Sequence, residues 1–206
     1  MGLGDRIKAN RDNPKLVTTP NIWVPERDKE PRLLIAPNIP KPMHSVCPRE
    51  ILGRAWWDKY RKQVYASTDH HCKACGVHKY EAKGEKWLEA HEVYDIDYSK
   101  ARMTFIKAVP LCNYCHMYIH DGRMKNLVQL GKMSHAKYAA VIQHGDAILA
   151  ETHLRKPTLE ERELMIQEKM NGNELRWEDW RLILNGIEYP PVYQSYAQWL
   201  KAMGWI

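Results

Sequence analysis

Cys72-Lys73-Ala74-Cys75 and Cys112-Asn113-Tyr114-Cys115 stand at the two ends of the stretch that decides the fold. A CxxC pair brings two thiolates to one ion from a single tight turn, and two pairs supply the four sulfurs that a structural zinc takes at about 2.3 Å. The residues between the pairs are enough for two strands and their connection. A disulfide arrangement is the alternative, but the N-terminus lacks the apolar core of a secretory signal. We therefore predict a structural zinc site formed by Cys72, Cys75, Cys112 and Cys115.

The segments between and after the two pairs predict two strands and a helix. Residues 87–96 partly alternate between apolar and polar side chains, as a strand does. Residues 103–111 are rich in Thr, Ile and Val and form the second predicted strand, interrupted by Pro110. A helix is expected to begin at Cys115 and to reach His120. The predicted fold class is α+β with a zinc-stapled core.

This order of motifs resembles the HNH endonucleases. The residues that carry the resemblance are the paired CxxC motifs, Leu88-Glu89-Ala90-His91-Glu92-Val93 at a strand end, and Leu111 to His120, which reads LCxxCHxxxH at the start of a helix. The closer likeness is to members encoded by bacteriophages and bacteria in which His-Glu replaces His-His or Asp-His. The likeness covers Arg49 to Arg123, roughly a third of the chain.

The resemblance implies a ββα-metal fold and metal-dependent hydrolysis of phosphodiester bonds in DNA. Members of the family hold a divalent cation such as Mg, Mn or Ni on the scissile phosphate, apart from the structural zinc, while a histidine activates water. Mapped onto this chain, His91 falls on a metal-ligand position, Glu92 on the position of the general base, and His116 on another ligand position. His120 lies one helical turn after His116 and is a second candidate ligand.

Two departures from the family pattern leave the register open. Residues 93–111 contain no asparagine where the family has one, and Glu92 stands where the family has an imidazole. In the alternative register His91 is the base, Ala90 falls on a ligand position, and an acidic side chain supplies an oxygen ligand, the candidates being Glu92, Asp95 and Asp97. Strand alternation places His91 and Asp95 on one face and Glu92 on the other, so Asp95 is a candidate metal ligand.

The positive charge of the chain gathers in its first two thirds. Residues 1–134 hold 23 Lys and Arg against 15 Asp and Glu, a balance of +8, whereas residues 135–206 hold 8 against 10, a balance of −2. This distribution suits a polyanionic partner, and we expect DNA. The candidate contacts lie on the helix that leads into the zinc region and just after the second cysteine pair: Arg54, Lys59, Arg61, Lys62 and Arg123.

The segment before the zinc region is rich in proline. Eight of the twelve prolines fall in residues 1–48, which excludes long helices and predicts an extended arm. Two apolar runs in it, Ile22-Trp23-Val24 and Leu33-Leu34-Ile35, are expected to pack on another surface. Pro48 begins a predicted amphipathic basic helix that reaches about Ala66, with apolar residues at every fourth position, namely Leu52, Trp56, Tyr60 and Val64.

The last third predicts helices and one hairpin. Helices are expected over residues 123–133 and 134–154. Thr158 and Glu161 form a capping box for a helix that ends near Met170. Asn185-Gly186 predicts a hairpin within residues 182–189, and Ser195 caps a last short helix.

The predicted divisions are an extended arm at 1–48, an HNH-like domain with its leading helix at 49–133, and a helical and α+β appendage at 134–206. The appendage is rich in Trp and Tyr, and these side chains favour protein interfaces. We therefore expect any protein partner to bind through this appendage or the arm.

Three functions fit the sequence. The first is an HNH endonuclease acting on DNA in the cytoplasm, the host's cytoplasm if the chain is phage-encoded. The second is a catalytically degenerate HNH fold kept as a scaffold that binds nucleic acid or protein, which Glu92 and the missing asparagine favour. The third is a zinc-ribbon transcription or assembly factor. No run approaches the roughly 18 apolar residues of a membrane span, so no membrane partner is expected.

Overall fold

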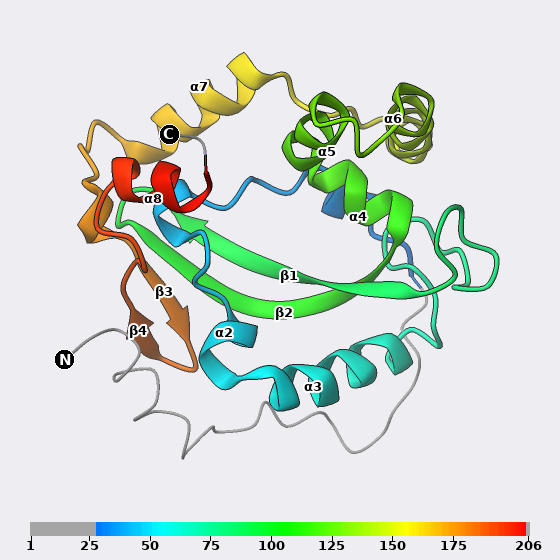
Figure 1. Cartoon of the computed structure of the whole chain (residues 1–206), viewed down its shortest axis with the longest axis horizontal. Helices are drawn as coiled ribbons and strands as arrows, with labels where there is room; N and C mark the ends of the chain where they lie inside the picture. Colours follow the sequence, from blue (N-terminus) through cyan, green and yellow to red (C-terminus); the bar gives the residue numbers. More distant parts are fainter. Residues whose placement is uncertain (1–27, 205–206) are drawn as a thin grey trace.

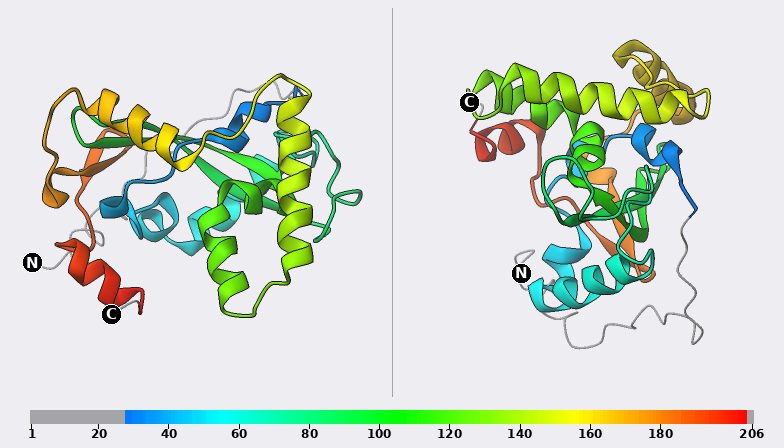
Figure 2. Two further views of the ribbon diagram at one scale, coloured as in Figure 1. Left: turned by 90° about the horizontal axis from the view of Figure 1, so that it is seen from above. Right: turned by 90° about the vertical axis from the view of Figure 1, so that its right-hand side faces the viewer.

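A long two-stranded hairpin forms the centre of the molecule. The computed structural model describes residues 28–204 and confirms the predicted α+β class. Strands β1 (Leu88–Asp97) and β2 (Arg102–Cys112) run antiparallel and curve through the middle of the view in Figure 1. Helix α3 (Arg54–Ala66) lies along one side of this hairpin. The other side carries α4 (Asn113–Ile119), α5 (Asp121–Gln129) and α6 (His135–Ala150) (Figures 1 and 2).

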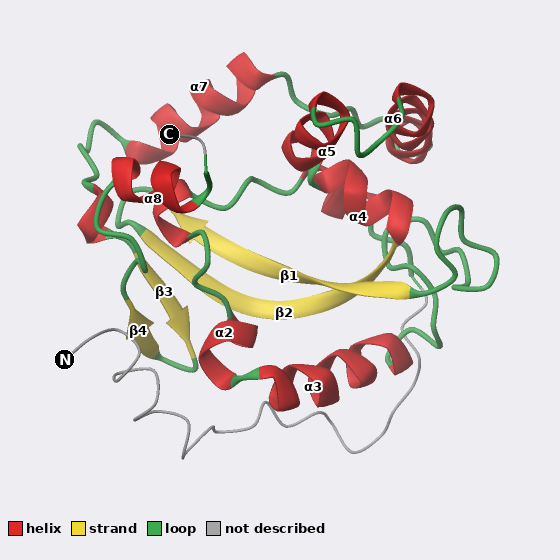
Figure 3. Ribbon diagram, in the orientation of Figure 1, coloured by secondary structure: helices red, strands yellow, loops and turns green. Residues whose placement is uncertain are grey.

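The C-terminal hairpin extends this central pair into one sheet of four strands, ordered β1-β2-β3-β4 (Figure 3). Strand β3 (Arg181–Leu184) pairs in parallel with β2 through Arg102 to Thr104, and β4 (Ile187–Tyr189) pairs antiparallel with β3. The predicted Asn-Gly turn joins them, with φ of 53° at Asn185 and 78° at Gly186. The sequence predicted this hairpin but not its place in the central sheet.

Pro110 lies within β2 and does not interrupt it, so the expected break is wrong. Its register partner in β1 is Ala90. Because β3 reaches β2 only at Arg102 to Thr104, β2 is an edge strand at Pro110. A proline is tolerated there because its missing N–H removes no bond of the sheet.

The predicted helix from Pro48 to Ala66 is broken at Gly53. Its first part is α2 (Pro48–Leu52), and α3 begins at Arg54. Gly53 has φ of 87°, a left-handed conformation that ends α2 and turns the chain into α3. In α3 the buried side chains are Trp57 and Val64, which pack on Ala108 of β2.

The described part of the proline-rich arm packs onto the rest of the chain. It contains two short 3₁₀ helices, η1 (Pro31–Ile35) and η2 (Lys41–Met43). Leu34 of the predicted Leu33-Leu34-Ile35 anchor is buried in the core around the cysteines, and Met43 is buried near the C-terminal hairpin. The other anchor, Ile22-Trp23-Val24, lies outside the described residues.

The C-terminal helices begin where their capping residues predict. Thr158 and Glu161 form the predicted capping box of α7 (Leu159–Met170), and Ser195 caps α8 (Tyr196–Ala202). The helices expected at 123–133 and 134–154 are α5 and α6, which end earlier than predicted, at Gln129 and Ala150. A 3₁₀ turn, η3 (Trp177–Asp179), precedes β3.

Two apolar clusters lie at opposite ends of the long hairpin. The first surrounds the cysteines and holds the inner faces of α4 and α6, including Tyr118, Val141 and Leu149. The second joins Met103 of β2 to Leu182 of β3, and also contains Met43 and Ile51 from before the zinc region. The hairpin therefore links segments that are far apart in the sequence.

Candidate metal centre

The four predicted zinc ligands come together. The ligand atoms of Cys72, Cys75, Cys112 and Cys115 all lie within 4.8 Å of one another, and none of these cysteines forms a disulfide. The Sγ atoms of Cys75 and Cys112 are 3.8 Å apart, which is about the sulfur–sulfur distance of a tetrahedron with bonds of roughly 2.3 Å. Hydrogen bonds from Cys112 and Cys115 lower the pKa of the Cys75 thiol, which favours its thiolate. The group can hold a structural metal ion.

Backbone and side-chain contacts fix this cysteine group in the fold. The amide N–H of Lys73, in the first cysteine turn, donates to the carbonyl of Pro110 in β2 at 2.8 Å. His144 of α6 places Nε2 3.6 Å from Cys115 Sγ and packs edge-on to Tyr114. No local sequence pattern marks His144 as a neighbour of the cysteines, because it lies 29 residues beyond Cys115.

Three imidazoles form a second group of possible metal ligands. His91 lies on β1 and His116 on α4, and His120 is the residue that directly follows α4. Their ligand atoms lie within 4.8 Å of one another. The ring centroids are 5.3 Å apart for His91 and His116, 5.2 Å for His91 and His120, and 4.7 Å for His116 and His120. One helical turn between His116 and His120 presents both rings to β1.

The environment keeps two of these imidazoles neutral. Burial lowers the pKa of His91 to about 3, and the neighbouring His116 and His120 add to the effect. Burial, together with His116 and Arg123, lowers the pKa of His120 to about 4. Nδ1 of His91 is buried and has no hydrogen-bond partner among the described residues. A neutral imidazole with an unsatisfied buried nitrogen fits a metal ligand, so this group can accept a cation.

The carboxylate of Glu89 orients the imidazole of His116. Glu89 Oε2 lies 2.7 Å from His116 Nδ1, and Asn113 Nδ2 donates to Glu89 Oε1 at 2.9 Å. Burial raises the pKa of Glu89, but the hydrogen bonds with His116 and Asn113 outweigh burial and leave it lowered. The bond to Nδ1 leaves Nε2 of His116 for a metal, as in carboxylate–histidine–metal arrangements. Glu89 lies two residues before His91 on the same strand face, a spacing that could have identified it.

Glu92 is not brought to the three imidazoles. The ladder between β1 and β2 is regular from Leu88 to Val93, so neighbouring side chains point to opposite faces. Glu92 pairs with Ala108, which packs against α3. Burial raises the pKa of its carboxyl, and the charged groups that act on it are Arg49 and, least of all, His116. Glu92 therefore lies on the face of β1 opposite His91.

Asp95 and Asp97 also lie outside this group. The register shifts between Val93 and Tyr94, and Ile106 of β2 is left without a partner in β1. Asp95 follows this irregularity and is exposed. Asp97 instead accepts hydrogen bonds within the turn between the strands, from Ser99 Oγ at 2.6 Å and from Lys100 Nζ at 2.9 Å.

The predicted nucleic-acid residues divide between the two sides of the hairpin. Four of them, Arg54, Lys59, Arg61 and Lys62, lie on α3, across the hairpin from α4. Arg61 is paired with Asp58 at 2.8 Å. Arg123 lies on α5, three residues after His120, and is exposed.

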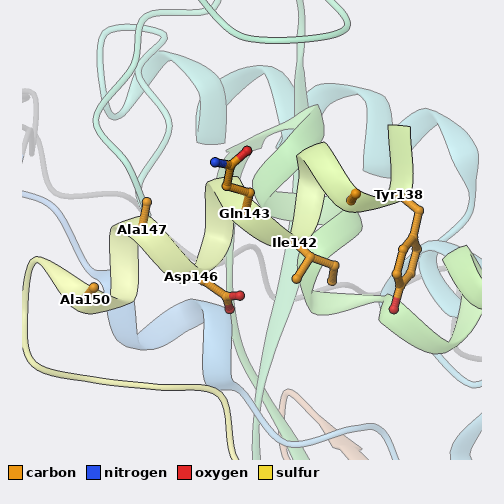
Figure 4. Close-up of a pocket in the computed structure, with 7 residues that line it drawn as sticks. Tyr138, Ile142, Gln143, Asp146, Ala147 and Ala150 are labelled. Carbon is orange, nitrogen blue, oxygen red and sulfur yellow. The ribbon is translucent and has the colours of Figure 1, made fainter. Parts of the chain in front are cut away.

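A shallow hollow on the outer surface of α6 contains none of these ligands. It is lined by Tyr138, Ala139, Ile142, Gln143, Asp146, Ala147 and Ala150 (Figure 4). Asp146 accepts a hydrogen bond from Tyr118 at 2.6 Å, which ties α6 to α4. The hollow offers a small apolar surface and no cluster of catalytic groups.

Among residues 28–204, no helix has the length and apolar character needed to cross a membrane. No protein-family model, no curated protein and no solved structure matches the chain. What the centre can do therefore follows from its own side chains.

Proposed function

We propose that this protein is a metal-dependent endonuclease that hydrolyses phosphodiester bonds of DNA. The observation that carries the proposal is the group of three imidazoles, His91, His116 and His120, whose ligand atoms lie within 4.8 Å of one another beside a separate four-cysteine group. In this proposal β1, β2 and α4 form a ββα-metal unit of the HNH kind. The four cysteines hold zinc, and the three imidazoles hold the second cation.

The donor set favours some cations over others. Three imidazole nitrogens suit Ni, Zn and other late first-row ions, whereas Mg prefers oxygen ligands. When bound, such a cation supplies positive charge that polarises a phosphoryl oxygen and favours ionisation of nearby water. The chain's own residues keep the site ready: burial keeps His91 and His120 neutral, and Glu89 orients His116.

The alternative register has less support. It makes His91 the base and needs an oxygen ligand from Glu92, Asp95 or Asp97. None of the three belongs to the group around His91. We therefore assign His91 as a metal ligand.

A plasmid-nicking assay tests this proposal. The zinc-loaded protein is incubated with supercoiled DNA and Mg, Mn or Ni, beside the variants His91→Ala and His116→Ala. We expect nicking with at least one ion and a loss of 100-fold or more in both variants. His135→Ala is the matched control, because His135 is exposed at the start of α6 and outside the group. Cleavage that survives His91→Ala, or no cleavage with any ion, contradicts the proposal.

The second candidate is a catalytically degenerate scaffold that binds nucleic acid or protein. The position of Glu92 favours it, because this residue occupies the place of the family's base yet lies across the strand from the imidazoles. The scaffold predicts DNA binding without cleavage under all metal conditions, which the same assay distinguishes from hydrolysis.

A further inference from the structure

Two basic surfaces of this molecule face in different directions. The basic side chains of α3 lie on the side of the hairpin that carries Trp57 and Ala108, whereas the three imidazoles lie on the side of α4. A DNA backbone held at the imidazoles cannot meet α3 at the same point, because the sheet separates them. The contacts next to the cleavage site must come from the α4 side.

On that side, a long stretch of the α5–α6 helical pair carries basic residues and no acidic residue. Residues 122–145 contain Arg123, Lys125, Lys132 and Lys137 and no Asp or Glu. All four side chains are exposed. The two helices run side by side and are joined by a short loop (Figure 2). This stretch begins two residues after His120, so its positive charge adjoins the imidazoles.

Asp121, the acidic residue that directly follows His120, does not oppose a polyanion. Asp121 Oδ2 lies 3.3 Å from Lys156 Nζ, 3.9 Å from Arg162 and 3.9 Å from Lys125. Three cations against one carboxylate leave an excess of positive charge. Lys156 Nζ also donates a hydrogen bond to the backbone carbonyl of Tyr118 at 2.7 Å. The charge around Asp121 is therefore positive, which attracts phosphates, whereas the carboxylate of Glu89 is taken up by its contact with His116.

Of the four basic residues in this stretch, Arg123 follows His120 most closely in the chain. It lies one helical turn after His120, a spacing that brings two side chains to the same face. Its charge contributes to the lowered pKa of both His120 and Glu89. Lys125 is 62% exposed, so its ammonium is accessible beyond its contact with Asp121.

We propose that the α5–α6 pair, led by Arg123 and Lys125, contacts the DNA backbone on either side of a phosphate held at the imidazoles. The inference rests on the proposed function for the identity of the polyanion. It assigns the backbone contacts to α5 and α6 and not to α3. Phosphate contacts of this kind position DNA without reading its sequence.

Equilibrium binding of a fluorescent DNA duplex to the full-length, zinc-loaded protein tests this inference. Anisotropy is measured over a range of salt concentrations without added Mg, Mn or Ni, so that cleavage does not enter. The double variant Arg123→Gln/Lys125→Gln is compared with Lys59→Gln/Lys62→Gln on α3, a matched pair of exposed cations. We expect at least tenfold weaker binding for the α5 variant at low salt. The slope of log K against log salt should fall by about two.

The α3 variant should lose less than twofold. The charge-preserving variant Arg123→Lys/Lys125→Arg should bind like the wild type, and circular dichroism should show all variants folded. Equal or greater loss in the α3 variant overturns the inference, as does wild-type binding that is unchanged by the α5 variant or absent at low salt. Failure of the nicking assay with α5-dependent binding intact would remove the proposed hydrolysis and leave this surface assigned.

Discussion

At the scale of single residues, the position of His116 depends on Glu89. A neutral imidazole binds a metal through one nitrogen, and a carboxylate on the other nitrogen fixes both the tautomer and the ring. Glu89 does this at 2.7 Å and is itself held by Asn113. Asn113 lies between the cysteines of the second zinc pair. The side chains of Asn113 and Glu89 thus connect the cysteine group to the imidazole group.

Substitution Glu89→Gln should weaken cation binding at the imidazoles and leave the zinc in place. Glutamine keeps the shape but removes the charge that favours Nδ1–H on His116. Loss of such a carboxylate partner typically costs 10–100-fold in metal affinity. Titration calorimetry with Ni or Mn on the zinc-loaded protein measures this, and elemental analysis should still find one zinc per chain.

Glu81→Gln provides the control, because Glu81 is an exposed glutamate in the loop before β1. It removes the same charge without touching an imidazole, and its Ni affinity should equal that of the wild type. If Glu89→Gln also binds Ni as tightly as the wild type, Glu89 has no part in positioning His116.

The residues of the centre differ in how far the sequence could predict them. His91, His116 and His120 were candidates because a motif places two of them one turn apart and the third at a strand end. Glu92 was a candidate from its place in the motif, although strand alternation already predicted the opposite face for it, and it lies there. His144 could not be predicted, since only the packing of α6 on α4 brings it to Cys115.

At the scale of elements, the contact between α4 and α6 depends on a glycine. Gly145 is buried in α6, and an added Cβ would overlap ring carbons of Tyr118, a fully buried side chain of α4. Neighbouring side chains enclose the ring completely, and its hydroxyl donates a hydrogen bond to Asp146, so moving the ring would disturb both. α6 therefore approaches α4 this closely only without a side chain at position 145.

We expect Gly145→Ala to destabilise the protein although alanine favours helices. Overpacking of this kind costs about 1–3 kcal/mol, which exceeds the gain of at most about 1 kcal/mol from helix propensity. Gly122 of α5 is the control, because a Cβ there meets nothing within 4 Å. Gly122→Ala should raise the free energy of unfolding by about 0.5–1 kcal/mol. Urea denaturation of both variants measures these changes in the free energy of unfolding. A neutral or stabilising Gly145→Ala would show that Tyr118 does not limit the approach of the two helices.

The capping box of α7 gives a pH-dependent contribution. Hydrogen bonds from Arg155 and from the backbone N–H of Thr158 lower the pKa of Glu161 to about 2. Its ordinary value is 4.5, so the cap stabilises the fold fully above that pH and is lost as the pH falls toward 2. Glu161→Gln should therefore lower the midpoint of thermal unfolding at pH 7, and its difference from the wild type should shrink as the pH falls below 4.5. Glu160→Gln changes the same charge in the first turn outside the cap, and it should show a smaller difference at pH 7.

At the scale of the whole molecule, the sequence predicted the local elements better than their assembly. Caps and turns at Thr158, Ser195 and Asn185-Gly186 depend on neighbouring residues and could be read directly. The parallel pairing of β2 with β3 joins residues about 80 positions apart, and no local pattern encodes such a contact. The last third was therefore expected as an appendage, whereas its hairpin completes the central sheet.

This assembly predicts that the C-terminal hairpin and the cysteine group unfold together. Leu182 of β3 is fully buried and packs in one cluster with Met103 of β2, the strand that ends at Cys112. Leu182→Ala should cost about 2–5 kcal/mol, as large-to-small substitutions in a core do. Because β2 runs from this cluster to Cys112, the loss of stability should appear at the cysteines as well as in the sheet. Cobalt substituted for zinc reports the cysteines through its thiolate absorption, and far-ultraviolet circular dichroism reports the fold.

Both signals should move to the same lower urea concentration in Leu182→Ala. Ile187→Ala is the matched control, because Ile187 is 41% exposed on the neighbouring strand, and its midpoint should shift far less. A cobalt transition that stays at the wild-type midpoint while the dichroism shifts would mean that the last third folds as a separate unit. The parallel pairing with β2 would then contribute nothing to the stability of the metal-binding half.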